Sequence, residues 1–239
     1  MENDTITAIL DYAESHETFT LEALATYICQ KTGTGKSSLS WYLFKLVNDN
    51  RLVRIGRGIY ARNIKPVFMP ELNKEAENVY KLLKTNFPFA GFCVYDGEII
   101  APLQHHLSPN RIIYVETERD SAETVFNFLK DETYNVYLRP DKELIYRYVD
   151  MDKRAVFVKN LVSEAPLQEL SGVPAPTIEK LLVDILRDPD FFYLQGSESL
   201  AVMENAFNLY AVNKSRMLRY AGRRKVKEEV LSIMEQINL

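Results

Sequence analysis

The first fifty residues alternate between apolar positions at helical spacing and short polar breaks, a pattern that predicts three helices. The apolar positions of the three segments are Ile6, Ile9, Leu10 and Ala13, then Leu21, Leu24, Ala25 and Ile28, then Leu39, Tyr42, Leu43, Leu46 and Val47. The breaks contain Thr20 and Thr34, which are suitable N-cap residues, and Asp49-Asn50, which favours a helix end. Gly33-Thr34-Gly35 is expected to form the turn between the second and third helices.

Two short apolar segments follow, residues 52–55 and 59–61, and they predict strands joined by Gly56-Arg57-Gly58. Because glycine tolerates positive φ, this connection is expected to be a tight turn with Arg57 at its tip. Three helices followed by a hairpin is the order of a winged helix-turn-helix. In that fold the third helix enters the DNA major groove and the hairpin lies along the backbone or minor groove.

The remainder of the chain alternates between helical and strand patterns after an extended, proline-containing segment at residues 64–70. Helices are predicted at 73–84, 98–106, 121–131 and 141–148, strands at 89–95, 111–117, 135–138 and 155–162, and final helices at 178–186, 197–211 and 223–237. We therefore expect an α/β (α+β) chain. It would comprise a winged helix-turn-helix at 1–63, a linker at 64–72, and a larger domain at 73–239 with a mixed sheet and a helical end.

Charge is distributed unevenly, although the net charge is only −4. Residues 1–30 contain six acids and no lysine or arginine, whereas residues 31–65 contain eight basic residues and one acid, Asp49. This concentration on the third helix and hairpin indicates a phosphate-binding surface. The residues expected to contact phosphates are Lys36, Lys45, Arg54, Arg57 and Arg62, and those expected to contact the groove are Ser37, Ser38 and Trp41. For Trp41, packing against the hairpin or the second domain is an equal alternative.

The composition favours a cytoplasmic protein without a membrane segment. No apolar run approaches the roughly 20 residues that span a bilayer, and the acidic N-terminus does not have the pattern of a signal peptide. The two cysteines, Cys29 and Cys93, lie far apart in apolar surroundings and are expected to be reduced, buried thiols.

Three sequence features that suggest catalysis or cofactor binding have simpler explanations. Gly35-Lys36-Ser37 resembles the end of a phosphate-binding loop, but that motif requires a preceding strand and a glycine where this chain has Gln30. His105 and His106 are adjacent, so their side chains point apart, and we expect no metal site. Asp96, Glu116 and Glu118 lie near strand ends, as nuclease ligands do. Because Glu118 occupies the place of the expected lysine, we interpret them as surface carboxylates.

A second basic segment lies near the C-terminus. Residues 213–227 contain seven basic residues and no acid. On a helix, Met217, Leu218 and Ala221 can face inward while the arginines face outward. The predicted outer face, for nucleic acid or an acidic partner, consists of Arg216, Arg219, Arg223 and Arg224.

Residues 46–60 resemble the winged-helix end of AbiE-type abortive-infection antitoxins of bacteria. Residues 178–188 and 213–224 resemble helical segments from the C-terminal part of the same family. The resemblance implies a two-part protein without catalytic activity. Its N-terminal domain would bind inverted repeats in its own promoter and repress the operon. Its C-terminal domain would contribute to repression and oppose a toxin that resembles nucleotidyltransferases.

We therefore predict an antitoxin and transcriptional autorepressor of a bacterial toxin–antitoxin, phage-defence operon. Its expected partners are double-stranded promoter DNA and the nucleotidyltransferase-like toxin, with no cofactor, no metal and no membrane. Two alternatives stay open from the sequence. One is a winged-helix regulator whose larger domain senses a ligand, and the other is a nuclease-like enzyme guided by a DNA-binding module.

Overall fold

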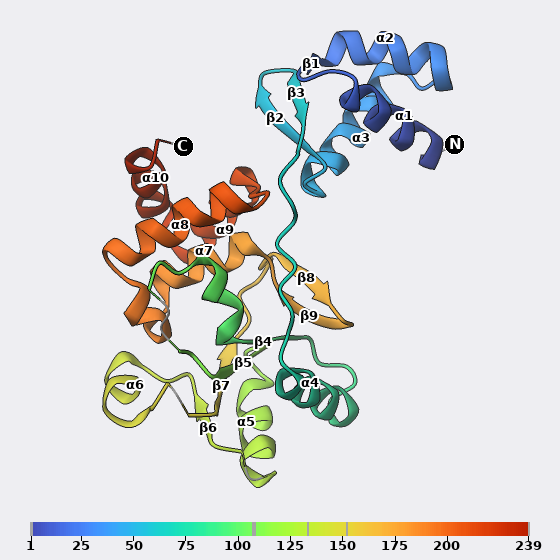
Figure 1. The fold of residues 1–239 in the computed structure, drawn as a ribbon. Helices are drawn as coiled ribbons and strands as arrows, with labels where there is room; N and C mark the ends of the chain where they lie inside the picture. Colours follow the sequence, from blue (N-terminus) through green and yellow to red (C-terminus); the bar gives the residue numbers. More distant parts are fainter. Residues whose placement is uncertain (1, 107–108, 133, 152, 239) are drawn as a thin grey trace. The chain divides into compact units, whose positions relative to one another are not determined.

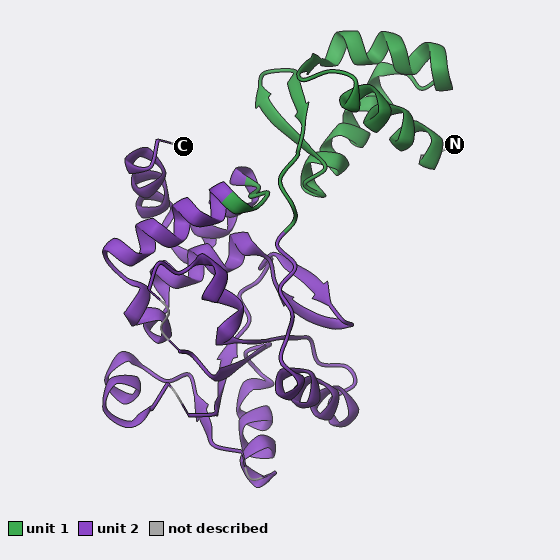
Figure 2. Ribbon diagram, in the orientation of Figure 1, with its two compact units in different colours: residues 1–67, 209–213 green, residues 68–208, 214–239 purple. Residues whose placement is uncertain are grey.

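The computed structural model describes residues 2–106, 109–132, 134–151 and 153–238. The chain is a mixed α and β protein, as predicted (Figure 1). It divides into two compact units: residues 1–67 with 209–213, called unit 1, and residues 68–208 with 214–239, called unit 2 (Figure 2). The predicted linker, residues 64–72, spans the boundary, and Phe68 within it is buried.

Unit 1 consists of three helices and a small antiparallel sheet. The elements are α1 (Glu2–Glu14), β1 (Phe19–Thr20), α2 (Leu21–Thr32), α3 (Lys36–Asn48), β2 (Leu52–Gly56) and β3 (Ile59–Arg62). The strand order is β1-β3-β2, with Phe19 opposite Tyr60 and Leu52 opposite Arg62. Each helix buries an apolar stripe in one core, to which Ile9, Leu24 and Leu43 belong. This arrangement has the element order predicted for a winged helix-turn-helix.

The helix ends of unit 1 follow local chemistry, with one difference from expectation. The hydroxyl of Thr20 accepts a bond from the Ala23 amide and caps α2, as predicted. Gly33 ends α2 in the left-handed conformation with φ 71°. The predicted cap of α3 is wrong: Gly35 occupies the N-cap position, and the Thr34 hydroxyl instead bonds to the hydroxyls of Thr5 and Thr32.

Unit 2 is built on a four-stranded mixed sheet. Its first elements are α4 (Lys74–Asn86), β4 (Phe92–Asp96), the 3₁₀ segment η1 (Gly97–Leu103), β5 (Ile112–Thr117), α5 (Ala122–Asp131), β6 (Val136–Leu138), α6 (Lys142–Tyr148) and β7 (Ala155–Asn160). The strand order is β4-β5-β7-β6; β4 pairs antiparallel with β5, while β5, β7 and β6 are parallel. Because β5 and β7 are parallel with Glu116 opposite Lys159, their carboxyl ends lie together.

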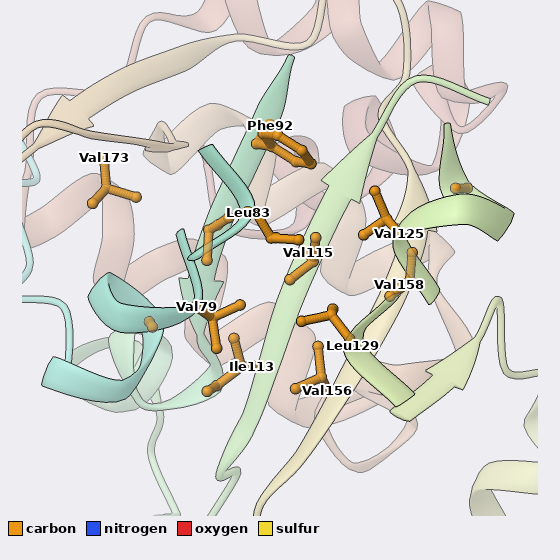
Figure 3. Packing of buried hydrophobic residues seen from close by; sticks show 13 residues of the cluster. Val79, Leu83, Phe92, Ile113, Val115, Val125, Leu129, Val156, Val158 and Val173 are labelled. Atoms are coloured by element: carbon orange, nitrogen blue, oxygen red, sulfur yellow. The ribbon is translucent and has the colours of Figure 1, made fainter. Parts of the chain in front are cut away.

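The two faces of this sheet differ in chemistry. One face packs against α4 and α5 through branched aliphatic side chains, including Val79, Leu83, Val115, Val125 and Val158 (Figure 3). The opposite face presents aromatic and ionic side chains. Tyr114 stacks on Tyr95 at 4.8 Å and contacts Phe157 and Phe191 at 5.8 and 5.5 Å between ring centres.

The C-terminal part of unit 2 adds a hairpin and a helical end. Its elements are β8 (Leu167–Leu170), β9 (Val173–Pro176), α7 (Ile178–Arg187), the 3₁₀ segment η2 (Pro189–Leu194), α8 (Ser197–Leu209), α9 (Lys214–Arg224) and α10 (Lys227–Gln236). The sequence patterns miss the β8–β9 hairpin, because Pro174 and Pro176 disfavour a strand. They also miss the separation of α9 from α10, where Lys225 adopts φ 60°. Phe89, predicted within a strand, is 99% exposed in the loop before β4.

Gly97 is required by a close approach between η1 and the start of β5. A Cβ at this position would lie 2.2 Å from Cγ of Asn110. Asn110 is buried and fixed, because its amide donates to the hydroxyls of Tyr114 and Tyr193 at 2.9 and 2.8 Å and its Oδ1 accepts from the Ile112 amide.

Substitution of Gly97 by alanine should therefore destabilise unit 2 by about 1–3 kcal/mol through overpacking. Chemical denaturation followed by circular dichroism measures the free energy of unfolding. Gly222→Ala is the matched control, because a Cβ there meets nothing within 4 Å and alanine favours the helix. Equal stabilities of the two variants would contradict the packing argument.

Candidate nucleic-acid interface

Helix α3 forms because apolar residues recur at helical spacing, and that same spacing defines its exposed face. Leu39, Leu43 and Leu46 are buried in the core of unit 1. The opposite side carries the stripe Ser37, Trp41, Phe44 and Asn48, spaced by four, three and four residues. Burial of the leucine side thus determines which side chains of α3 remain available to a ligand.

The N-terminus of α3 has the electrostatics of an anion-binding helix end. No side chain caps it, and its first turn contains no acid. Ser37 and Ser38 are exposed there, and Lys36 approaches Glu22 at 3.7 Å in an exposed pair. Such a surface pair contributes little and is readily exchanged. Backbone N–H groups and the helix dipole both favour a phosphate at this position.

Two aromatic side chains lie at the centre of the exposed face. Trp41 is 53% exposed and Phe44 is 63% exposed. Trp41 meets Tyr42 edge-on at 5.1 Å, and the Lys45 ammonium lies 5.3 Å from the Trp41 ring centre. Trp41 therefore does not take the buried position that packing against the hairpin would require. Phe44 was not among the predicted site residues, although its spacing from Trp41 identifies the same face.

The β2–β3 hairpin places Arg57 at its tip, as predicted. Gly58 adopts φ 70°, which a side chain would strain. Arg57 is exposed and makes no ion pair within the part of the chain that the structure describes. Arg54 is also exposed, and its Nε donates to the Gly56 carbonyl at 3.2 Å, next to an irregularity in the β2–β3 pairing. The hairpin thus presents two guanidinium groups.

Arg62 differs from the other predicted phosphate ligands. Its guanidinium forms a 2.6 Å ion pair with Glu14 near the end of α1. This contact lies at the base of the hairpin, beside a polar pocket that includes Asp11 and Asn50. The Arg62–Glu14 pair is shorter than the 3.7 Å pair of Lys36 with Glu22, so Arg62 is the more firmly engaged cation, and Lys36, Lys45, Arg54 and Arg57 are the predicted phosphate ligands that remain.

The predicted basic face of α9 in unit 2 requires correction. Met217 and Ala221 are buried, as expected, but Arg224 also points inward and bonds to Asp188. Arg216 lies 3.6 Å from the buried Glu179. Arg223 pairs with Glu164 at the surface, which leaves Arg219 as the exposed arginine without a described ion pair. Burial of carboxylates on α7 draws these cations inward, so the four arginines do not form one outer face.

A buried ionic network joins α7, η2 and α9 to the sheet of unit 2. Lys180 is fully buried and its Nζ lies 2.6 Å from both Glu116 and Asp184. The hydroxyl of Tyr95 donates to Glu116 at 3.2 Å, and that of Tyr220 donates to Asp184 at 2.9 Å. This inner part of the network connects β4, β5, α7 and α9.

The outer part of the network is centred on Lys159. Its ammonium lies 2.6 Å from Asp188 and 2.7 Å from Asp190. Burial opposes the charge of Lys159, but the two aspartates outweigh it and raise the lysine pKa. Burial likewise opposes ionisation of Asp188, yet Lys159 and Arg224 hold its pKa below the usual value. Lys159 and Asp188 are therefore charged at neutral pH, whereas burial raises the pKa of Asp190 despite its contact with Lys159.

The acidic residues at the strand ends do not form an open metal site. Asp96 and Glu116 are buried, so the interpretation of them as surface carboxylates is wrong. Asp96 accepts backbone bonds from Asn73 and Glu98, and Glu116 is paired with Lys180. Within the described ranges, no group of three or more His, Cys, Asp or Glu residues could hold a metal ion.

The rings of His105 and His106 meet edge-on at 4.6 Å between centres, so the expectation that these side chains point apart is wrong. The backbone amides of His105 and His106 donate to Glu198 at 2.8 and 3.2 Å. Cys93 is a buried free thiol, as expected, whereas Cys29 is exposed, contrary to expectation.

No helix among the described residues is long and apolar enough to cross a membrane.

The fold defines a class of α/β protein in which a three-helix unit with a β-hairpin precedes a mixed-sheet domain. The chain belongs to a family of unknown function, DUF6577, whose model matches residues 38–239. That match begins within α3 and continues through the hairpin and all of unit 2. A comparison with curated proteins gave no match.

Proposed function

We propose that the chain is a DNA-binding transcriptional autorepressor and the antitoxin of a toxin–antitoxin operon. The observation that carries the DNA-binding part is the surface of unit 1. An acid-free, uncapped helix N-terminus and two exposed aromatic residues lie on α3, and Arg57 projects from the adjoining hairpin. In this proposal α3 enters the major groove, and Arg57 contacts the backbone or the minor groove.

Phosphate and base contacts have separate roles in this proposal. Lys36, Lys45, Arg54 and Arg57 neutralise phosphates and thereby set the position of α3 on the duplex. Ser37, Ser38 and Trp41 lie between Lys36 and Lys45 along α3 and would face the base edges. Binding to an inverted repeat would place one copy of the chain on each half-site.

The antitoxin part of the proposal is based on the resemblance of residues 178–188 and 213–224 to AbiE-type antitoxins. These two segments form α7 and α9, which are joined through Asp184 and its contacts with Tyr220 and Arg224. The buried, cation-paired carboxylates of unit 2 favour a binding role over a nuclease role. Unit 2 would therefore oppose a nucleotidyltransferase-like toxin by contact rather than by catalysis.

One observation supports the alternative function, in which unit 2 senses a small ligand. A polar cavity of about 660 Å³ lies in unit 2, lined in part by Lys74, Arg111 and Arg154. Arg154 is engaged with Glu75 at 3.0 Å, so a small anion would compete with that carboxylate. In this alternative, the affinity for DNA would depend on a small anionic molecule.

The test of the DNA-binding part is binding of the full chain to the DNA immediately upstream of its gene. We expect selective binding over unrelated DNA. Four phosphate contacts per copy should produce a slope of log affinity against log salt near −3.6, at about −0.9 per contact. Fluorescence anisotropy across a salt titration measures both quantities. Equal binding to unrelated DNA would contradict the autorepressor function.

A further inference from the structure

The exposed face of α3 contains few of the side chains that usually distinguish bases. Arginine or lysine pairs with guanine, and asparagine or glutamine pairs with adenine. Helix α3 contains no arginine or glutamine, and its asparagine, Asn48, is the last residue of the helix and half-buried. Its two lysines lie towards the ends of the helix, Lys36 at the first position and Lys45 in the last turn, and the Lys45 ammonium lies against the Trp41 ring.

The centre of this face is instead apolar. Phe44 follows Trp41 by three positions, so the Cβ atoms of the two residues are about 5–6 Å apart on the same side of the helix. Successive bases of one DNA strand are about 3.4 Å apart along the axis. The two rings therefore have the spacing to meet bases at neighbouring or next-neighbouring positions. The apolar group that a base presents in the major groove is the 5-methyl group of thymine.

We propose that Trp41 and Phe44 recognise thymine by covering 5-methyl groups in the major groove, an inference that rests on the proposed DNA-binding function. Ser37 and Ser38 add hydroxyl contacts at the start of the same face. The operator half-site is accordingly a thymine-containing sequence read mainly by apolar contact. Charge favours DNA over an apolar protein surface as the occupant, because α3 contains no acid and the hairpin that follows it carries the exposed Arg54 and Arg57.

Replacement of thymine by uracil tests this inference without altering the protein. The upstream DNA is amplified with either thymidine or deoxyuridine nucleotides, which differ at each site by one methyl group. A methyl group removed from water contributes about 0.8 kcal/mol, or about fourfold in affinity. The wild-type chain should therefore bind uracil DNA about 15-fold more weakly for two covered methyl groups per copy.

The variant Trp41→Ala/Phe44→Ala supplies the second half of a double-mutant cycle. It should bind thymine DNA and uracil DNA with equal affinity, because the rings that cover the methyl groups are absent. Both side chains are more than half exposed, so the core of unit 1 is left intact. Phe89→Ala is the matched control: Phe89 is 99% exposed in unit 2, and its loss should leave the 15-fold preference unchanged.

The outcomes separate this inference from the proposed function. Selective binding with equal affinity for thymine and uracil DNA would overturn methyl recognition while leaving the autorepressor function in place. A thymine preference that persists in the double variant would also overturn it, because the preference would then arise from DNA shape or other residues. Failure of the wild-type chain to bind either fragment selectively would overturn the proposed function itself. Trp41 is the only tryptophan, so its fluorescence independently reports whether this face is covered.

Discussion

Replacement of Lys180 by methionine should lower the free energy of unfolding of unit 2 by about 3–5 kcal/mol, the cost of removing one partner from a buried ion pair. Lys180 is fully buried and contacts Glu116 and Asp184 at 2.6 Å each. Methionine retains much of the apolar stem but leaves two buried carboxylates without their shared cation. The hydroxyls of Tyr95 and Tyr220 cannot replace that charge.

The destabilisation should also depend on pH, which distinguishes charge from packing. Burial raises the pKa of Asp184, and Lys180 opposes that rise. Without Lys180, the folded-state pKa of Asp184 lies further above the unfolded value. The folded variant therefore gains stability as acidification protonates this carboxyl group, and the destabilisation should be smaller at pH 5 than at pH 8.

Urea unfolding followed by circular dichroism at both pH values measures these effects. Lys81→Met is the matched control, because Lys81 is exposed and its pair with Glu77 is a surface contact. We expect a change within about 0.5 kcal/mol for that control. If Lys180→Met lowered the free energy of unfolding no more than Lys81→Met does, or by the same amount at both pH values, the result would contradict a charged network.

Simultaneous replacement of Lys36, Lys45 and Arg57 by alanine should weaken DNA binding about 1,000-fold at low salt. Each charge-assisted phosphate contact is assigned about 1.5 kcal/mol, near the lower end of the range for bonds to charged groups, which sums to about 4.5 kcal/mol or about three decades in affinity. The salt slope should also fall in magnitude by about 2.7. Lys36 and Lys45 lie in the first and last turns of α3, and Arg57 lies at the tip of the hairpin.

The matched control replaces Lys31, Arg51 and Lys65 by alanine, which changes the net charge by the same amount. Lys31 pairs with Asp11, and Arg51 borders the pocket beside α1. Loss of non-specific attraction should weaken binding in both variants, but only the first should lose most of the salt slope. Anisotropy titrations at several salt concentrations measure the difference. If the two triple variants had equal salt slopes, the overall charge of the protein, rather than the surface of α3 and the hairpin, would be what attracts DNA.

The elements of unit 1 could be predicted because their causes are local. Leu39, Leu43 and Leu46 recur at helical spacing, Thr20 caps α2, and glycines bracket the turn at Arg57. The exposed face of α3 follows from the same pattern, because it lies opposite the leucines. Phe44 lies on the same face and is exposed, although it was not among the predicted site residues.

The inward position of Arg224 could not be predicted from the α9 sequence. On an isolated helix its charge favours solvent, and residues 213–227 contain no acid to pair with it. Asp184 and Asp188, which receive Arg224, lie on or directly after α7, 36 or more residues earlier in the sequence. The carboxylates are buried by tertiary packing, and a buried carboxylate requires a cation.

The sequence by itself determined the helices of unit 1, the strands of the mixed sheet and the concentration of basic residues on α3 and the hairpin, since periodicity, turn residues and charge act over a few residues. Only the tertiary structure decided which charges remain at the surface. The parallel register of β5 and β7 sets Glu116 opposite Lys159, and the packing of α7 inserts Lys180 beside Glu116. Burial penalises each lone charge, so distant residues of opposite charge pair inside unit 2.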